Sequence, residues 1–286
     1  MSFRKVSIKS TRLLKDEDSG KDVLHVDSPH ALFQAAGYLK FKFGASGGEG
    51  IYFRGQQKLY DGGSLTPSLY RGISSKKTQD DKHAALSKII NEFIRQDSIF
   101  QKFNQYAYEP LLQHYGISTS WIDIVDNVWI ALWFACYKAI KVKKFMHFEE
   151  RIPSDMDDKD KFAYILLVAA DLSCFSPHNP GYYSSSKTEL IDLRIAAPSI
   201  FLRPHDQHGL LFRKKDKIRR PIDYADQIRG VIRVDLAKAI EWIGNGKMIN
   251  THSLFPPPYY DNGYQILLNC DAARRSETEY IAHIGV

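Results

Sequence analysis

The chain has 286 residues, of which 44% are hydrophobic and 13% aromatic, and its formal net charge is +6 at pH 7. A chain of this length and composition buries a large core, which argues against disorder over most of it. Its three cysteines, Cys136, Cys174 and Cys270, form no CxxC pair, so a zinc ribbon and a disulfide framework lack support and we expect a reduced, cytoplasmic setting.

Four predicted elements occupy the first part of the chain. Residues 23–27 predict a short strand. Ser28 and Pro29 suit the cap and first position of a helix that reaches about Lys40. Residues 44–50 are rich in glycine and predict a turn, and residues 50–55 then predict a buried strand that ends at a glycine.

The middle of the chain predicts two helices and a central strand. Apolar residues follow helical spacing over 84–107 and again after Asp123, through the apolar segment 124–140. The charged residues 146–161 predict a linker. The continuous apolar run 162–170 predicts a strand inside a sheet.

The last third alternates loops with short elements. Residues 175–187 predict a loop, 230–234 a strand and 235–242 a helix. Three prolines make 254–260 rigid and extended, and a final strand is expected near 280–284. Because strands and helices are mixed without regular alternation, we predict an α+β fold in a single mixed domain.

Residues at the end of the second predicted strand form the first group with possible chemistry. Phe53, Arg54, Gly55 and Gln56 stand together. An arginine at a strand end can present its guanidinium to a phosphate or carboxylate, and the glycine lets a ligand approach the backbone. A structural ion pair at the strand end is the alternative.

The run QHYGISTSWID, residues 113–123, is the densest polar group of the chain. Its members are Gln113, His114, Tyr115, Gly116, Ser118, Thr119, Ser120 and Asp123. An unpaired buried hydroxyl or imidazole costs about 1–3 kcal/mol, so this density beside an apolar segment predicts a cavity wall with polar groups turned toward a ligand. The alternatives are that Asp123 caps the following helix and that His114 is a satisfied core histidine.

Two further groups stand later in the chain. Arg203, Gln207 and His208 predict a polar turn that faces a ligand, and the loop context argues against a metal site. The basic run 213–220 predicts either nucleic acid binding or a mobile basic loop. Its cations are Arg213, Lys214, Lys215, Lys217, Arg219 and Arg220.

These groups, in this order, resemble the FRG domain, a bacterial and phage module named for its Phe-Arg-Gly motif, here Phe53-Arg54-Gly55. The segment TPSLYR, which includes Arg71, resembles its second block, and residues 113–135 resemble its longest block. Arg203 and Gln207 belong to the segment that is similar to a late block. The resemblance covers roughly residues 30–270, which leaves 1–29 as an N-terminal extension and 271–286 as a C-terminal strand or extension.

The sequence departs from the family pattern at two places. Ser120 stands where the family commonly has arginine, and Ile124 and Val125 replace a tryptophan-threonine pair. The missing arginine bears on phosphate contacts.

A more distant similarity is to the arginine–serine–glutamate ADP-ribosyltransferases, which implies a split-sheet core with flanking helices and NAD as substrate. It implies a catalytic set of Arg54, Thr119, Asp123 and Gln207. The NAD contacts that it implies are Phe53, Arg54, Gly55, Gln56, Arg71, Gln113, His114, Tyr115, Gly116, Ser118, Thr119, Ser120, Arg203 and His208. No late glutamate is evident, so Gln207, His208 or Asp123 would take its place.

The resemblances together imply an NAD-dependent ADP-ribosyltransferase-like protein that modifies nucleic acid, or protein, in a phage-defence or toxin setting. This requires Arg54 and the bend at Thr119 to line one cavity. The alternative is a catalytically inactive module that binds a nucleotide or nucleic acid. A third interpretation is a phosphodiesterase or nuclease that uses His114, Asp123 and His208. No signal peptide and no membrane span are expected, because the N-terminus and the remaining chain lack the required apolar runs.

Overall fold

A large mixed sheet forms the framework of the protein. The computed structural model describes residues 3, 7–17, 19–73, 75–153, 161–174, 178–216, 222–271 and 281–284. Within these residues one sheet has nine strands in the order β1-β2-β11-β7-β3-β4-β10-β9-β8. Its strands are β1 (Thr11–Lys15), β2 (Asp22–Val26), β3 (Glu49–Gln56), β4 (Ile122–Val125), β7 (Phe162–Asp171), β8 (Tyr182–Ser184), β9 (Thr188–Asp192), β10 (Gly209–Lys214) and β11 (Ile228–Asp235). Its neighbours pair antiparallel except β2 and β11.

The sheet has a weak joint between β3 and β4. β3 pairs with β7 along its full length, from Glu49 to Gln56. Toward β4, its pairing is confined to Phe53 opposite Val125. Beyond that pair the two strands separate, so the sheet divides into two halves at this joint.

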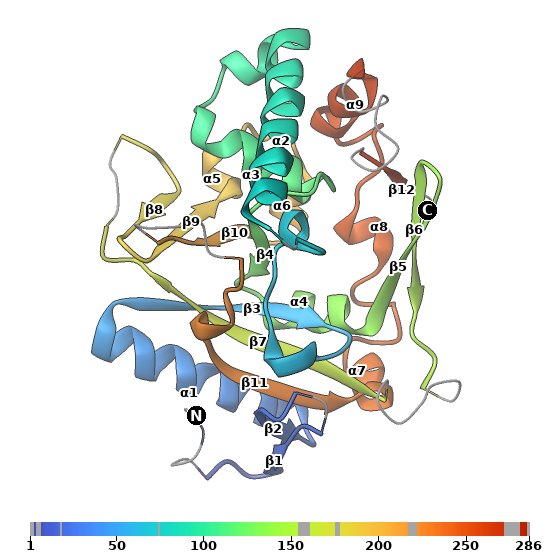
Figure 1. Ribbon diagram of the computed structural model, residues 1–286. Coiled ribbons are helices and arrows are strands. Elements are labelled where there is room, and N and C mark those ends of the chain that lie inside the picture. Colours follow the sequence, from blue (N-terminus) through green and yellow to red (C-terminus); the bar gives the residue numbers. More distant parts are fainter. Residues whose placement is uncertain are drawn as a thin grey trace.

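A small second sheet stands beside the main one. It contains β5 (Tyr137–Val142), β6 (Phe145–Glu150) and β12 (His283–Ile284), with β6 in the middle. β5 and β6 form an antiparallel hairpin, and Figure 1 shows it at the side of the molecule near α8 (Thr251–Leu254). The hairpin replaces the end of the predicted helix and the first part of the predicted linker 146–161, of which residues 154–160 lie outside the described residues.

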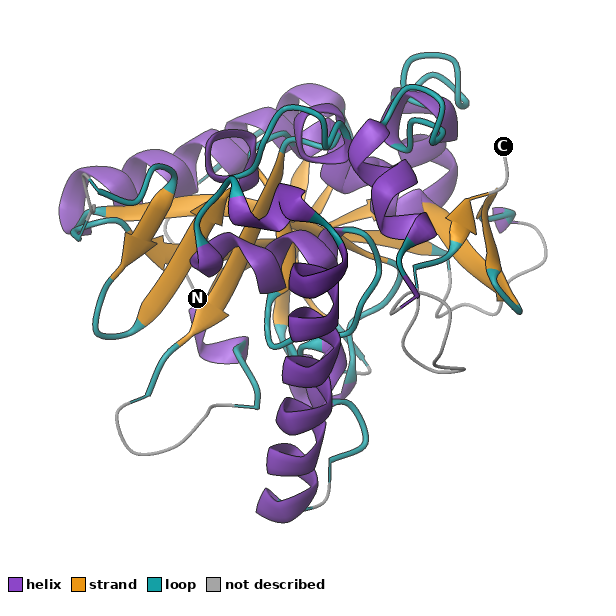
Figure 2. Ribbon diagram, turned by 90° about the horizontal axis from the view of Figure 1, so that it is seen from above, coloured by secondary structure: helices purple, strands orange, loops and turns teal. Residues whose placement is uncertain are grey.

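Helices lie on both sides of the strands (Figure 2). One group packs on the half of the sheet that contains β3, β7 and β11, and consists of α1 (Pro29–Gly47), α4 (Val128–Cys136) and α7 (Leu236–Trp242). The other half carries α2 (Lys76–Gln96), α3 (Tyr108–His114), α5 (Leu193–Ala196), α6 (Arg203–Asp206) and α9 (Asn262–Asn269) around a second apolar cluster. The α+β prediction is confirmed.

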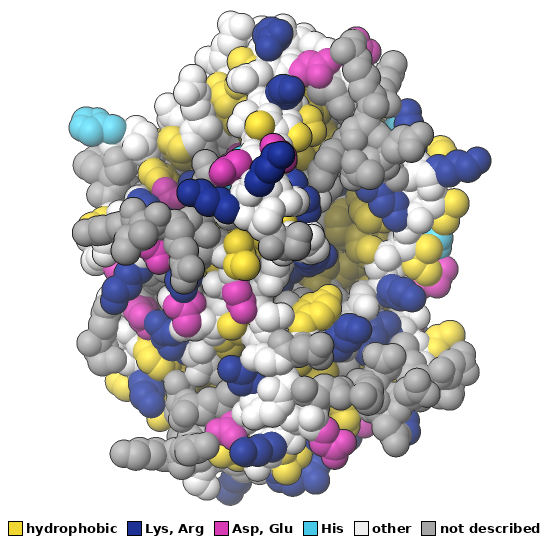
Figure 3. Space-filling model, in the orientation of Figure 1, with side chains coloured by type: hydrophobic (Ala, Val, Ile, Leu, Met, Phe, Trp, Pro, Cys, Tyr) yellow, Lys and Arg dark blue, Asp and Glu magenta, His cyan; other side chains and the backbone are white. Residues whose placement is uncertain are grey.

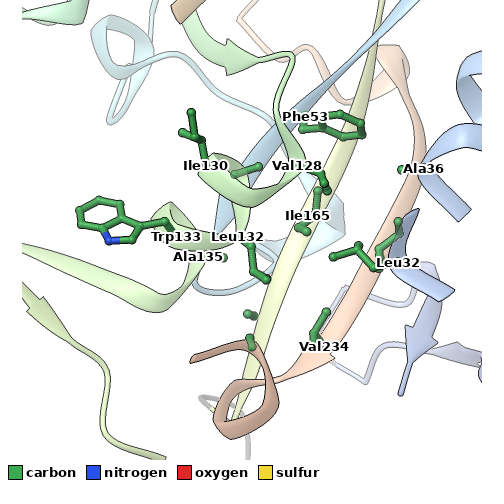
Figure 4. Close-up of a cluster of buried hydrophobic side chains, with 14 of the residues drawn as sticks. Leu32, Ala36, Phe53, Val128, Ile130, Leu132, Trp133, Ala135, Ile165 and Val234 are labelled. Atoms are coloured by element: carbon green, nitrogen blue, oxygen red, sulfur yellow. The ribbon is translucent and has the colours of Figure 1, made fainter. Parts of the chain in front are cut away.

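The first apolar cluster contains both residues that pair at the β3–β4 joint, Phe53 and Val125. Leu32 of α1, Phe53 of β3 and Ile165 of β7 are buried together with the α4 side chains, including Val128 (Figure 4). This packing fixes the strand that carries Arg54.

Capping explains where α1 begins and ends. The Ser28 hydroxyl accepts the N–H of Ala31, and Pro29 occupies the first turn, as predicted. The predicted turn at 44–50 is wrong for its first half, because the helix continues to Gly47. It ends only where Gly48 adopts a left-handed conformation with φ 66°.

The predicted helix over 124–140 is wrong at both ends. Residues 122–125 form β4, and α4 begins only after Asn127, whose side chain accepts the N–H of Trp129. Asp123 therefore lies within a strand and does not cap the helix. Most of the apolar residues from Ile124 to Cys136 are buried, so the run has no clear polar face and its periodicity does not separate strand from helix.

The remaining predicted elements are mostly confirmed. β7 is a buried interior strand, and β11 leads into α7, whose N-terminus Asp235 caps. The helix predicted over 84–107 is displaced, since α2 ends at Gln96 and two short 3-10 turns follow.

Three predicted segments near the end of the chain, a loop, an extended segment and a strand, differ in how well they match the structure. The loop at 175–187 contains the short strand β8, with 175–177 outside the described residues. The segment 254–260 starts at the end of α8 and turns at 258–260. The final strand is present as β12. None of the helices in the described ranges has both the length and the apolar character needed to cross a bilayer.

Candidate functional site

A cavity of about 400 Å³ lies at the joint where β3 and β4 separate. β3 contributes Phe53, Arg54 and Gly55, and β4 contributes Asp123. The loop after α3, the helix α6 and the β5–β6 hairpin complete the wall. Figure 3 shows a hollow with hydrophobic side chains in its depth and lysine or arginine side chains at its rim.

Arg54 lies at the edge of the joint with part of its hydrogen-bonding capacity unused. Its Nη1 donates to the backbone oxygen of Asp123 at 2.6 Å, whereas its Nε is buried without a hydrogen-bond partner. Burial lowers the pKa of the guanidinium, Asp123 opposes that shift and Arg71 adds to it. The guanidinium stays protonated in the neutral pH range. An anion in the cavity would therefore offset the free-energy cost of burying this positive charge.

Three arginines line the cavity, namely Arg54, Arg71 and Arg203. Among the described residues of the lining, Asp123 supplies the carboxylate that faces them. Guanidinium groups bind phosphate and carboxylate oxygens through paired N–H donors. The charge of the wall therefore suits an anionic ligand.

Asp123 is held in a fixed position but stays accessible. Its Oδ2 accepts from Gln113 Nε2 at 2.8 Å, and its Oδ1 lies 3.4 Å from His114 Nδ1 without hydrogen-bond geometry. Burial raises the pKa of the carboxyl, but His114, Arg54 and Gln113 outweigh it and hold the pKa below its usual value. Because 40% of the side-chain surface is exposed, the cavity contains an ionised and oriented carboxylate.

The serine and threonine residues of the polar run lie outside the cavity lining, and Thr119 and Ser120 bond to other side chains of the protein. Thr119 is fully buried, and its Oγ1 donates to Gln113 Oε1 at 2.8 Å. Ser120 Oγ donates to Glu109 Oε1 at 2.8 Å and is buried as well. Neither of these two residues, nor Ser118, contributes to the cavity lining. Thr119 thus orients Gln113, which in turn orients Asp123, instead of turning its own hydroxyl to a ligand.

His114, Tyr115 and Gly116 all line the cavity. His114 is packed so closely against Gly209 that a Cβ there would come within 2.5 Å of its ring, and its Nε2 has no hydrogen-bond partner. The Tyr115 hydroxyl donates to Asp261 at 2.6 Å. Gly116 adopts a φ of 104°, a conformation that favours glycine.

Arg203 is enclosed by aromatic rings. Its guanidinium carbon lies 4.0 Å from the ring centroid of Tyr264, 4.5 Å from that of Tyr115 and 5.5 Å from that of Phe255. Only 2% of the residue is exposed, and Nε and Nη2 have no hydrogen-bond partner. Cation–π contacts stabilise the charge, yet the unpaired N–H groups leave the site ready for an acceptor.

Gln207 lines the cavity but its amide is engaged elsewhere, and His208 lies outside the cavity lining. Gln207 is 4% exposed, and its Nε2 donates to the Leu254 backbone oxygen at 2.6 Å. His208 Nδ1 bonds Asp126 at 2.9 Å in another hollow, which Phe53 separates from this cavity. The structure thus does not bring His208 together with His114 and Asp123. Among the described residues no group of three histidine, cysteine or acidic side chains could hold a metal ion.

Gly55 lines the cavity and also has a packing role, whereas Gln56 lies outside the cavity lining. A Cβ at Gly55 would lie 1.8 Å from the Ala131 oxygen, so the glycine permits α4 to pack on β3. Gln56 lines a neighbouring hollow.

Sequence reasoning missed the aromatic part of the cavity wall, which includes a ring that packs against Arg203. Its members are Phe134, Tyr137, Phe148 and Phe255. Tyr137 stacks on Trp133 with 4.4 Å between ring centroids, and Phe148 stacks on Phe255 with 4.3 Å. The alternation of wall residues in β5 and β6 is a strand signal that the helix and linker predictions overlooked.

The described part of the basic run is neutralised within the protein. Arg213 Nη2 lies 2.6 Å from Glu189, and its guanidinium stacks on Trp121. Lys214 pairs with Asp226 at 2.7 Å, and Lys215 Nζ lies 3.8 Å from Glu189. The other predicted nucleic acid contacts, Lys217, Arg219 and Arg220, lie outside the described residues.

Comparison with known proteins supports one family. The family model described as FRG domain matches residues 49–144, from β3 to the β5–β6 hairpin, so the predicted resemblance is confirmed there. The match covers less than half of the chain, and the limits 30–270 stay a prediction. Searches of curated proteins and of solved structures gave no match.

Proposed function

We propose that the cavity at the β3–β4 joint binds NAD⁺ and that the protein is an ADP-ribosyltransferase-like enzyme. The observation that carries this proposal is the joint itself. It presents Arg54 and the ionised Asp123 in one cavity, with a set of arginines and an aromatic wall. A dinucleotide with two phosphates, a cationic ring and a ribose carbon that becomes positive matches those features.

Binding divides along the cavity. Arg54 and Arg71 hold the diphosphate, because their guanidinium groups face the same space and repel each other until an anion lies between them. The nicotinamide ring lies against the aromatic wall that includes Tyr137 and Phe148. Its positive charge is stabilised there by the ring faces.

The reaction breaks the bond between C1′ of the ribose and the nicotinamide nitrogen. The electron pair of that bond leaves with nicotinamide, which departs as a neutral molecule, and the ribose carbon gains oxocarbenium character. The Asp123 carboxylate stabilises this charge. An acceptor O–H or N–H attacks C1′, and its proton passes to Asp123 and then to solvent.

The Thr119 hydroxyl and the Gln113 amide do not contact NAD⁺ in this proposal but position the carboxylate that does. Thr119 and Gln113 keep the Asp123 carboxylate in place. Gln207 is a structural residue, since its amide holds the Leu254 backbone. Asp123 therefore takes the role that a late glutamate has in the transferases that this chain resembles.

Nucleic acid is the proposed acceptor, with protein second, and phage defence or a toxin activity is the proposed setting. The net positive charge of the chain supports a polyanionic partner. A reduced cytoplasmic location, suggested by the cysteine pattern, belongs to the same proposal.

The test is nicotinamide release from labelled NAD⁺, with DNA, RNA or cell lysate as acceptor source. Arg54→Ala should abolish release in a folded protein. Asp123→Asn should lower it by about 10²–10³-fold, the scale of a lost transition-state contact. Arg12→Ala is the matched control, because Arg12 is an exposed arginine with 62% of its side chain accessible. Parental release by folded Arg54→Ala would refute the proposal.

A binding module without catalysis is the second candidate. Asp123 is already hydrogen-bonded by Gln113 and close to His114, an arrangement that also suits a purely structural carboxylate. This candidate predicts that the parent binds NAD⁺ or a nucleotide and releases no nicotinamide with any acceptor.

A further inference from the structure

A second hollow of about 450 Å³ adjoins the cavity. Arg71 lines both spaces. Arg54 and Gln56 are two residues apart on β3, so their side chains point to the same face of the sheet. Arg54 lines the cavity and Gln56 lines the hollow.

We propose that this hollow is the acceptor subsite and that it binds a base of single-stranded nucleic acid. The inference rests on the proposed function, since an acceptor must reach the cavity in which NAD⁺ is cleaved. The hollow meets that need because it shares Arg71 with the cavity.

Gln56 supplies the polar group that contacts the base edge. The residue is 9% exposed, and its Oε1 has no hydrogen-bond partner. A buried amide oxygen without a partner is unfavourable, and an N–H on a base edge would satisfy it. An amide offers both a donor and an acceptor, which matches the paired groups of a nucleobase.

Tyr60 supplies a stacking surface. It is 45% exposed, and Lys58 Nζ lies 5.7 Å from its ring centroid. Tyr70, which is buried with its hydroxyl 3.0 Å from His83 Nε2, closes the base of the hollow. An exposed ring next to a cation is the arrangement on which proteins stack successive bases of a single strand.

Arg71 supplies the phosphate contact between the two spaces. The residue is exposed, and Lys82 Nζ donates to its backbone oxygen at 2.9 Å, which fixes the local chain. Asp223 also lines the hollow, but its Oδ1 accepts the N–H groups of Leu65 and Ala225 at 2.8 and 2.9 Å. Among the described residues, the charged lining of the hollow thus consists of the Arg71 guanidinium and the Asp223 carboxylate, and one oxygen of that carboxylate is already held by two backbone N–H groups.

The transfer step links the two spaces. A nucleophilic nitrogen or oxygen of the bound base forms the new bond to C1′, while the bond from C1′ to nicotinamide breaks and its electron pair leaves with nicotinamide. The proton that the base loses goes to Asp123 and then to solvent. No further reactant is needed.

The test is fluorescence anisotropy with labelled single-stranded 12-mers of DNA and RNA, without NAD⁺. Tyr60→Ala should weaken binding about 5- to 100-fold, the usual effect of removing a stacking ring. Gln56→Leu should weaken it less and keep the fold, since it removes an unpaired amide. Tyr259→Ala is the control, because Tyr259 is 82% exposed and lines neither space.

The outcomes separate this inference from the proposed function. Unchanged oligonucleotide binding by both variants, no binding by the parent, or exclusive labelling of protein in a lysate would overturn the acceptor subsite. Nicotinamide release to water and NAD⁺ binding should stay at parental values in Tyr60→Ala. Absence of NAD⁺ binding by the parent, together with oligonucleotide binding that Tyr60→Ala weakens, would refute the proposed function and the transfer step and would leave the hollow as a base-binding site.

Discussion

Replacing Gly55 by alanine would place a methyl carbon 1.8 Å from the backbone oxygen of Ala131 and 2.9 Å from the backbone nitrogen of Ala135. Both atoms belong to α4, so no side-chain rotation relieves the contact. Either α4 moves away from β3 or the strand shifts. In both cases the cluster of Phe53, Val128 and Ile165 separates.

Overpacking a core typically lowers the free energy of unfolding by about 1–3 kcal/mol. We expect a loss of about 3 kcal/mol or more here, because the clash is with backbone atoms that cannot rotate away. For a protein of this size about 3 kcal/mol corresponds to a Tm lower by roughly 6–12 °C. Urea unfolding followed by circular dichroism and by tryptophan fluorescence measures the loss. The variant should also bind ligands of the cavity poorly, because Arg54 is carried by the displaced strand.

Gly37→Ala is the matched control. Gly37 lies inside α1, and a Cβ there would meet nothing within 4 Å. Alanine should stabilise that helix by about 0.5–1 kcal/mol. The reasoning fails if Gly55→Ala unfolds at the parental urea concentration, or if both variants shift stability in the same direction.

Two further predictions concern charged groups of the site. Arg203→Met should keep or raise the Tm, because it removes a buried charge whose Nε and Nη2 have no hydrogen-bond partner, and such a group is costly to bury. It should weaken NAD⁺ binding about 10- to 100-fold, the worth of a charged hydrogen bond. A strongly destabilised variant in thermal melts would contradict this. The pKa of Asp123 in the folded protein is held below its usual value. The ionised carboxylate therefore stabilises the folded state fully at any pH above the pKa of an unfolded carboxyl group, about 3.9. This stabilisation is lost as the pH falls from there through the pKa of the folded protein. Acid unfolding should therefore be less steep in Asp123→Asn than in the parent over that window, and identical slopes would refute the assignment.

Much of the fold follows from local sequence signals. Ser28 and Pro29 start α1 through a side-chain cap, and the continuous apolar run of β7 marks a strand that is buried on both faces. These signals depend on neighbours in the chain. The β5–β6 hairpin also has a local signal, the alternation of its cavity-lining residues, but its pairing with β12 joins segments that are far apart in the sequence.

Sequence reasoning named several residues that line the cavity, but it did not give their geometry. Arg54, Arg71, Asp123 and Arg203 line one cavity, and their role there stays a prediction. The sequence does not show that Gln113 lies between Thr119 and the cavity, because that order depends on the turn after α3. The aromatic wall depends on the hairpin and was missed with it.

The spatial requirement of the proposal, that Arg54 and the bend at Thr119 line one cavity, is not met by the hydroxyl residues themselves, because Thr119 and Ser120 are buried outside the lining. Arg54 contacts the backbone of Asp123, and Asp123 contacts Gln113, which binds Thr119. The arginine and the hydroxyl bend are thus joined through one hydrogen-bonded chain, although Thr119 itself does not reach the cavity.

Calorimetric titration with NAD⁺ is the most direct measurement of the central claim, that Arg54 faces an anion-binding cavity for this dinucleotide. The parent and Arg12→Ala should bind NAD⁺ with the same affinity. Arg54→Ala should bind at least about 10-fold more weakly, since one charged hydrogen bond is worth about 1.5–3 kcal/mol. Equal affinity in the folded Arg54→Ala protein, or no detectable binding by the parent, would contradict the account.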